Sequence, residues 1–143
     1  MRPNTITNQG RQHYYIGAAG ESLTIVDLLS QKIPSYIVAA GLKYDVVADI
    51  DGRLIRIQVK TTSKPVTRYE TPEYKYSPYS KERVLTRKED PIENDFDIIA
   101  FVALDRRLVG YQVAKGLPVT VRHSYERLRT LTFNNALKEL DSL

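Results

Sequence analysis

The sequence predicts a single α+β domain spanning residues 1–143, in which a mixed β-sheet of about five strands is flanked by helices. Three observations predict this fold class. A chain of 143 residues can bury one hydrophobic core, and 42% hydrophobic with 27% charged residues is ordinary for a globular protein. Apolar residues repeat at helical spacing near both ends of the chain and form strand-like runs between them. A long irregular segment separates two groups of these runs.

The first expected element is a helix within residues 9–32. Its apolar residues recur three or four positions apart, as one buried helical stripe would. Glycines weaken a helix, so we expect Gly17 and Gly20 to allow the close approach of another backbone. The predicted stripe consists of Ala19, Leu23, Val26, Leu29 and Ile33.

Short apolar or alternating runs predict the strands. The Asp51-Gly52 pair between two of these runs is a strong signal for a two-residue hairpin turn. After the last run, Ser124 is a suitable N-cap for a closing helix, whose apolar face includes Phe133 and Leu137. The expected strands are residues 36–40, 44–50, 54–61, 96–104, 108–114 and 118–123.

Residues 62–94 have no regular periodicity and predict a long insertion, with one short helix near residues 80–88. The insertion holds four of the seven prolines and four of the ten tyrosines. Between residues 64 and 88 it carries seven basic and three acidic side chains, an excess of four that equals the net charge of +4 for the whole chain. Long loops in compact domains are commonly functional, and a basic one favours a polyanionic partner.

The remaining composition excludes several classes of protein. Without cysteine the chain has neither disulfides nor thiolate metal ligands. No apolar run is long enough to cross a bilayer, and residues 1–10 lack the apolar segment of a signal peptide. We therefore expect an intracellular, cytoplasmic protein with no membrane partner.

The predicted hairpin sorts its side chains onto two faces. With Asp51-Gly52 as the turn, the numbers of opposed residues sum to 103, so Asp45 faces Gln58. One face is apolar and must be core, because it collects Val46, Ala48, Ile50, Ile55, Ile57 and Val59. The other face is polar and carries Asp45, Gln58 and Lys60 away from the turn, within reach of a common point. From the pattern alone, this polar face could equally be an ordinary solvated surface.

The residues Glu21 on the first helix, Tyr44-Asp45 opening a strand, and Gln58-Val59-Lys60-Thr61 in the next resemble the PD-(D/E)XK nuclease superfamily. The Gln-x-Lys form resembles the branch of small homing endonucleases associated with group I introns. Archaeal Holliday junction resolvases share the scaffold, usually with an acid at the position of Gln58. The resemblance implies a restriction-endonuclease-like core and a deoxyribonuclease.

The resemblance also implies a set of roles. Mg²⁺, with Mn²⁺ as a substitute, would be held by Asp45, the Gln58 amide, the Val59 backbone carbonyl and, through water, Glu21. Lys60 would orient the attacking water and stabilise the charge of the transition state. Glu21 has a simpler interpretation, as a glutamate that favours the start of its helix. Tyr44 replaces the nominal proline of the pattern, and Gln58 replaces its second acid.

The insertion supplies the expected contacts with DNA, because basic side chains bind phosphates and tyrosines stack on bases. A tyrosine-rich edge strand or an oligomer contact is an equally good interpretation of the tyrosines. Asp49 and Asp51 are expected in turn or surface roles, and Asp97 as a capping or pairing residue at the start of a strand. His13 and His123 are expected as structural or phosphate-facing residues. The expected DNA-binding residues are Lys64, Arg68, Tyr69, Lys75, Tyr76, Lys81 and Arg83.

These observations predict a metal-dependent endonuclease that cuts double-stranded DNA, of a homing or phage type. A homodimer or higher oligomer is expected, because one small active site cuts one strand at a time. Two alternatives remain open. One is a structure-specific junction resolvase that uses the same site, and the other is a non-catalytic DNA-binding module on the same scaffold.

Overall fold

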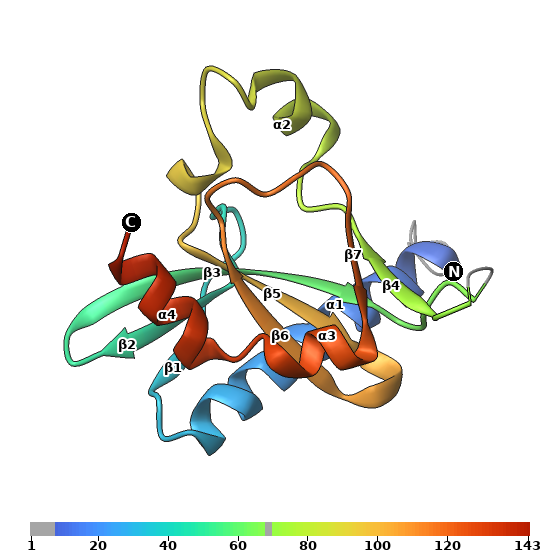
Figure 1. The fold of residues 1–143 in the computed structure, drawn as a ribbon, viewed down its shortest axis with the longest axis horizontal. Helices are drawn as coiled ribbons and strands as arrows, with labels where there is room; N and C mark the ends of the chain where they lie inside the picture. The colour runs from blue at the N-terminus through green and yellow to red at the C-terminus, as the bar shows by residue number, and fades with distance from the viewer. Residues whose placement is uncertain (1–7, 68–69) are drawn as a thin grey trace, which may run out of the picture.

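The computed structural model describes residues 8–67 and 70–143, and its helices surround a central twisted sheet (Figure 1). The helices are α1 (Asn8–Ser30), α2 (Lys81–Thr86), α3 (Tyr125–Thr130) and α4 (Phe133–Asp141), with 3-10 turns η1 (Ile92–Asn94) and η2 (Leu104–Arg106). The strands are β1 (Ser35–Ile37), β2 (Val46–Ile50), β3 (Arg53–Thr62), β4 (Glu73–Tyr76), β5 (Ile98–Ala103), β6 (Leu108–Val113) and β7 (Val121–Ser124).

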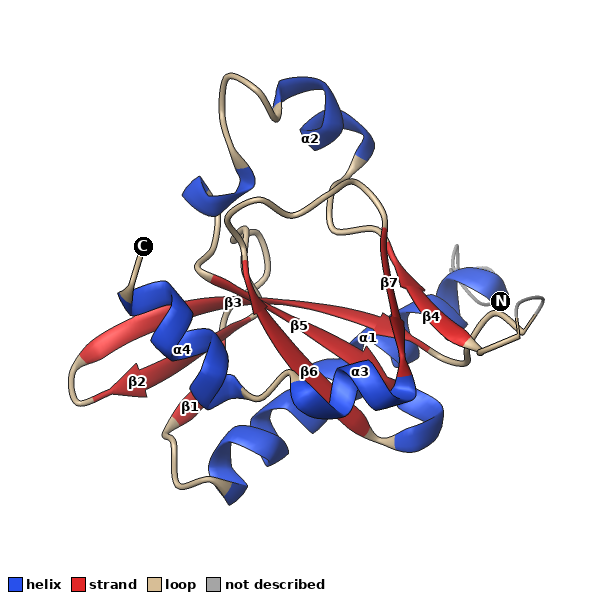
Figure 2. Ribbon diagram, viewed as in Figure 1, coloured by secondary structure: helices blue, strands red, loops and turns tan. Residues whose placement is uncertain are grey.

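Five of these strands form one mixed sheet in the order β1-β2-β3-β5-β6. The central pair β3 and β5 is parallel, whereas every other neighbouring pair is antiparallel. Strands β4 and β7 form a separate antiparallel pair. A mixed sheet of about five strands flanked by helices was the expected fold class, and it is confirmed (Figure 2).

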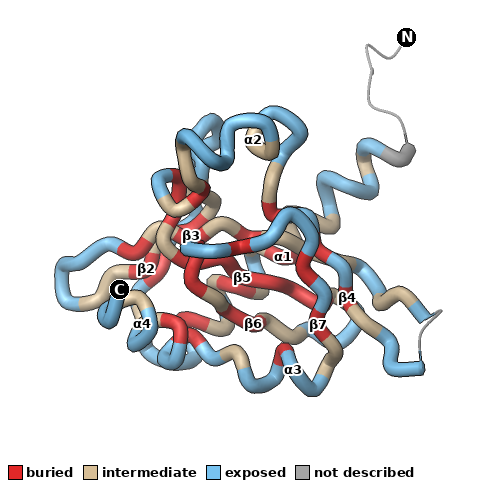
Figure 3. The backbone as a smooth tube through the Cα atoms, turned by 45° about the horizontal axis from the view of Figure 1, so that its top comes forward, coloured by how far each residue is buried: buried red, intermediate tan, exposed pale blue. Residues whose placement is uncertain are grey.

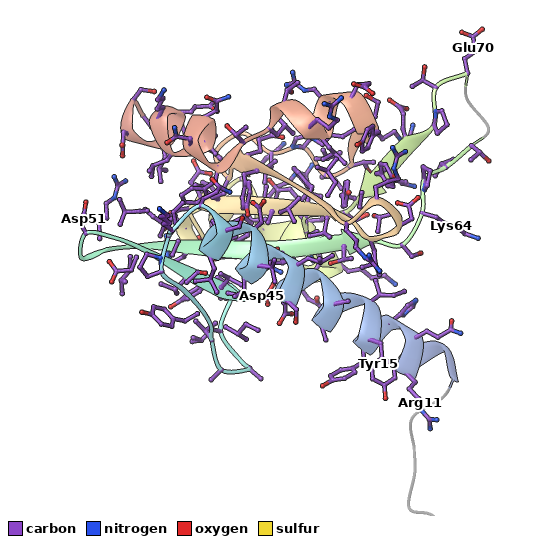
Figure 4. All side chains as sticks on the ribbon, turned by 90° about the horizontal axis from the view of Figure 1, so that it is seen from below. Arg11, Tyr15, Asp45, Asp51, Lys64 and Glu70 are labelled. Carbon is purple, nitrogen blue, oxygen red and sulfur yellow. The ribbon has the colours of Figure 1, made fainter. Side chains whose placement is uncertain are left out.

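The sheet separates two hydrophobic clusters. Helix α1 covers one face, where Leu28 packs with the inward residues of β2, β3 and β5. The β4–β7 pair and α3 lie over the other face, opposite α1 (Figure 4). They contribute residues to the cluster that contains Phe101. Strand β5 is buried along its whole length, while α2 projects from the body and has no buried residue (Figure 3). No helix within the described residues is both long and apolar enough to span a membrane.

The predicted apolar stripe of α1 is partly wrong. Val26 and Leu29 are 62% and 52% exposed, whereas the buried positions are Gly20, Thr24 and Leu28. Thr24 satisfies its hydroxyl by donating to the Gly20 carbonyl at 2.9 Å, so a polar side chain is accepted in the core. The helix therefore uses small residues to approach the sheet closely, and hydrophobicity alone selected a stripe rotated away from it.

The hairpin prediction is confirmed in register and in facing. Val47 pairs with Arg56 and Ile50 with Arg53, around a turn in which both Asp51 and Gly52 have positive φ. The apolar face is core, since Val46, Ala48, Ile55, Ile57 and Val59 are all at most 8% exposed.

The insertion contains more structure than its pattern predicted. Its short helix is present as α2, but residues 73–76 form strand β4, which the sequence left within an irregular segment. Tyr74 and Tyr76 are 2% and 3% exposed and pack in the cluster around Phe101. The edge-strand interpretation of the tyrosines is thus correct for these two residues.

The chain ends in two helices rather than one. Ser124 caps α3 by accepting a hydrogen bond from the Arg127 amide at 3.1 Å, as expected. The helix stops at Leu131, and Thr132 then caps α4 by accepting from the Asn135 amide. A second capping residue inside the expected helix allows this break.

Candidate active site

Three polar side chains meet in one cavity at the open end of the hairpin. Asp45 precedes β2, while Gln58 and Lys60 lie two residues apart on β3. All three line a cavity of about 290 Å³. The structure therefore brings together the hairpin residues that the sequence singled out.

Asp45 is held rigidly although it lies just outside β2. Its amide donates to the Ile57 carbonyl at 2.9 Å, and its carbonyl accepts from the Val38 amide at 3.0 Å. Its Oδ2 atom accepts a hydrogen bond from the Val59 amide at 2.9 Å. One carboxylate oxygen is thus fixed by β3, which sets the direction of the other.

Glu21 reaches the same region from α1. Burial raises the pKa of Glu21 above its ordinary value, and the negative charge of Asp45 raises it further. Burial also raises the pKa of Asp45, although the Val59 amide and the charge of Lys60 act in the opposite direction. Two carboxylates that disfavour each other's charge favour a cation between them.

The insertion builds the far wall of this cavity, with Pro78, Ser80 and Arg83 beside the hairpin. Arg83 Nε donates to Oδ2 of Asp95 at 2.7 Å, and its Nη2 donates to the Pro91 carbonyl at 3.0 Å. Asp95 is only 8% exposed and also lies 3.6 Å from the Lys43 ammonium. This buried pair fixes α2 next to the site.

Sequence reasoning missed Asp95 and the anchoring role of Arg83. The pair joins helix α2 to a residue 12 positions further along the chain, just after η1, so no periodic pattern connects the two residues. The only signal in the sequence was an acidic residue, Asp95, shortly before the fully apolar strand β5. Arg83 was expected to contact DNA, but its guanidinium is occupied by Asp95.

The donors at the site suit a hard cation that keeps much of its water. Among the described residues, no three His, Cys, Asp or Glu side chains gather into a ready-made metal-binding group. Oxygen atoms come instead from three separate places, namely Glu21 on α1, Gln58 on β3 and Asp45 just before β2. Mg²⁺ typically takes one or two carboxylates, several waters and a substrate phosphate, so these residues fit it.

The other expected DNA-binding residues fall into three groups. Lys64, Lys75 and Lys81 are exposed around the insertion. Tyr76 is buried with its hydroxyl enclosed, so the expected stacking of its ring on a base is contradicted. Arg68 and Tyr69 lie outside the described residues.

The remaining polar candidates have structural partners. Asp97 receives hydrogen bonds from the Arg56 amide and guanidinium, and Asp49 accepts from the Gly52 amide in the hairpin turn. His123 is 8% exposed against the Phe101 ring, and burial lowers its pKa to about 4. His13 is exposed on α1.

Asp45→Asn is expected to stabilise the metal-free protein at neutral pH, raising Tm by a few degrees at most. A carboxyl whose folded pKa is raised loses stability as pH rises from its unfolded to its folded pKa. The advantage of the variant should therefore vanish on acidification, when Asp45 becomes neutral in the wild type. Thermal melts in EDTA from about pH 3 to about pH 8, a range that extends from below to well above the ordinary carboxyl pKa values, measure this difference.

The matched control is Asp51→Asn, which removes the same charge from the exposed turn of the same hairpin, where asparagine also accepts positive φ. Mg²⁺ should raise the Tm of the wild type and of Asp51→Asn but not that of Asp45→Asn. An equal response of all three proteins would contradict a metal site at Asp45.

Comparison with known proteins identifies the family. The PD-(D/E)XK endonuclease family matches residues 12–136, which is most of the chain. The chain belongs to this family. The resemblance expected from Glu21, Asp45 and the Gln58-x-Lys60 motif is confirmed. A search of curated proteins finds no significant match.

Two solved structures share the fold of this PD-(D/E)XK endonuclease family member. The bacterial homing endonuclease I-Ssp6803I superposes with a TM-score of 0.61 at 14% identity, over 97% of this chain and 100% of the other. The Holliday junction resolvase Hjc of Archaeoglobus fulgidus gives a TM-score of 0.51 at 13% identity, over 84% and 97% of the two chains. Both are similar in fold, and both are nucleases.

Proposed function

We propose that this family member is a Mg²⁺-dependent endonuclease that hydrolyses phosphodiester bonds in double-stranded DNA, of a homing or phage type. The supporting observation is that Asp45, Gln58 and Lys60 line one cavity. The electrostatic coupling of Glu21 to Asp45 adds a second carboxylate to this group. Family membership supports the endonuclease chemistry, and this geometry supports the choice of these residues.

Each residue has a distinct task in this proposal. Asp45 and the Gln58 amide oxygen hold the cation, with the Val59 carbonyl beside them and Glu21 acting through water. When bound, Mg²⁺ (or Mn²⁺ in its place) acidifies water and neutralises charge on the phosphate. The Lys60 ammonium orients the attacking water and stabilises the negative charge that develops on the phosphate oxygens.

The basic insertion is proposed to hold the DNA. Lys64, Lys75 and Lys81 are exposed there, and phosphate contacts of this kind make binding sensitive to salt. Arg83 contributes indirectly, because its pair with Asp95 fixes α2 beside the active site. Arg68 and Tyr69 remain proposed DNA contacts. The proposed substrate also places the site of action inside the cell.

A second copy of the chain is the proposed protein partner, because one such site cuts one strand at a time and a second site allows both strands to be cut in one complex. The second half of helix α1 and the adjacent edge strand β1 expose four large apolar side chains, which are suited to an interface between copies. These are Val26, Leu29, Tyr36 and Ile37, each more than half exposed. Sedimentation analysis tests this, and a strictly monomeric protein on DNA would contradict it.

The activity is tested with a plasmid library that carries randomised inserts, so that no target sequence need be known. We expect the wild type to produce cut ends in Mg²⁺ and none in EDTA, with the ends mapped by sequencing. Asp45→Asn should reduce cutting to background, whereas Asp51→Asn should cut normally. Cutting that is equal in the wild type and Asp45→Asn would show that this site does not perform the reaction.

The wild type and the same variants also distinguish two alternative functions. A junction resolvase, suggested by the fold shared with Hjc, would cut a synthetic four-way junction and leave the duplex plasmid library intact. A non-catalytic DNA-binding module is suggested by the neutral Gln58 in place of an acid. It would bind DNA in a salt-sensitive manner and cut neither substrate with any divalent ion.

A further inference from the structure

A second cavity lies beside the candidate active site, between the first half of α1 and the end of β3. Its volume is about 470 Å³. One wall is formed by His13, Ile16 and Gly17 and the other by residues 59–63. Figure 4 shows this half of α1 running outward to Tyr15 and Arg11, with Lys64 beyond the end of β3 on the same side of the molecule.

Gly17 and Gly20 on α1 differ in what surrounds them. A Cβ atom on Gly20 would lie 1.8 Å from Oγ1 of Thr61, so close packing against β3 requires glycine there. A Cβ atom on Gly17 would meet nothing within 4 Å. Glycine weakens a helix by about 1 kcal/mol relative to alanine, and packing within the described chain does not require it at Gly17. Open space at this position is suited to a ligand that approaches the helix backbone.

This second cavity, called the groove below, is aligned with the candidate active site. His13, Gly17 and Glu21 follow each other at intervals of four residues and so lie along one side of α1. Gly17 is about 6 Å from Glu21 along the helix axis, a length comparable to the separation of successive phosphates in a DNA strand. Lys60 lines both the groove and the cavity that holds Asp45. The groove therefore lies about one nucleotide away from the candidate active site along a bound strand.

The lining of the groove suits an anion. Lys60 provides an ammonium group, and the exposed His13 and Ser63 provide an imidazole and a hydroxyl. The Thr62 hydroxyl already donates to the Lys75 carbonyl at 2.7 Å, so it is not a donor for a ligand. None of the described residues that line the groove carries a carboxylate.

We infer that this groove binds the backbone phosphate next to the one that is cut, with His13, Ser63 and Lys60 as its donors. The inference rests on the proposed function for the identity of the strand. In this inference, the absence of a side chain at Gly17 provides space for the bound DNA strand. It also gives the first half of α1 a role in binding DNA in addition to the basic insertion.

The test is binding of a labelled, mixed-sequence duplex in EDTA, measured by fluorescence anisotropy. Gly17→Glu is expected to bind at least about tenfold more weakly than Gly17→Gln, because the two side chains fill the groove equally and differ only in charge. Both variants should fold, since both residues favour helix more than glycine does. Circular dichroism and thermal melts verify this.

Ser22→Glu and Ser22→Gln form the control pair. Ser22 is exposed and lies five residues from Gly17, about 140° around α1. The two control variants should bind DNA alike. An equal loss of DNA affinity in Gly17→Glu and Gly17→Gln would assign the groove to a neutral occupant and overturn the inference. Wild-type affinity in both variants, or a wild type that does not bind DNA, would also overturn it. If the Gly17 variants show the expected charge dependence but the wild type never cuts DNA in Mg²⁺, the proposed function is contradicted and the groove remains supported.

Discussion

Lys60→Met is expected to slow DNA cleavage by roughly 10²–10³-fold, the usual effect of removing one group that stabilises transition-state charge. Lys60 lies two residues from Gln58 on β3 and lines the cavity with Asp45. Burial raises the pKa of Asp45, and the positive charge of Lys60 opposes that rise. Methionine keeps most of the length and apolar stem of the side chain and removes only the ammonium group, so the fold should be unchanged.

The measurement is a single-turnover rate at saturating DNA, compared with the rate of Lys64→Met. Lys64 is exposed just beyond the end of the same strand and is proposed to contact DNA without taking part in the reaction. Lys64→Met should weaken binding and leave the rate at saturation unchanged. A saturating rate for Lys60→Met within about threefold of the wild type would remove Lys60 from the mechanism, since such groups contribute far more.

Gly20→Ala is expected to destabilise the protein by about 2 kcal/mol or more, in the range of overpacked cores. The added Cβ atom would lie 1.8 Å from Oγ1, 2.9 Å from Cβ and 3.0 Å from Cγ2 of Thr61, so α1 or β3 must move. Glu21 is the next residue of α1, and Lys60 is the neighbour of Thr61. The shift should therefore reduce cleavage as well as stability.

Gly17→Ala is the matched control, because its Cβ atom meets nothing and alanine favours helix by about 1 kcal/mol. The control should be as stable as the wild type or more stable. Adding Thr61→Ala to Gly20→Ala removes two of the three close atoms and should restore part of the loss. Urea denaturation measures all four proteins. If Gly20→Ala unfolds at the wild-type midpoint, the close packing of α1 on β3 is not a requirement of the fold.

The sequence alone determined the hairpin and its two faces. The Asp51-Gly52 turn fixes the register, because its two positive φ angles suit the twist of the flanking strands. Once the register is fixed, alternation along each strand assigns every side chain to a face. The placement of Asp45 beside Gln58 and Lys60 follows from these local rules, as does the family resemblance carried by the same residues.

Only the tertiary structure decided which side of α1 packs on the sheet. Hydrophobic spacing selected Val26 and Leu29, but the close approach at Gly20 turns Thr24 and Leu28 inward. The insertion shows the same limit, since Tyr76 is buried through β4 pairing with the distant β7. Arg83 likewise finds Asp95 through the folded chain.

Local pattern thus placed the residues of the candidate site that share one hairpin, where sequence separation is short and backbone geometry is regular. The contacts that surround this hairpin join segments far apart in sequence. They depend on the shapes of packed side chains and on ion pairs between separate segments of the chain, and neither leaves a periodic signal. For this reason the sequence was enough to predict the hairpin part of the candidate site. The structure was needed to define the surrounding cavity wall, the Arg83–Asp95 pair and the groove beside α1.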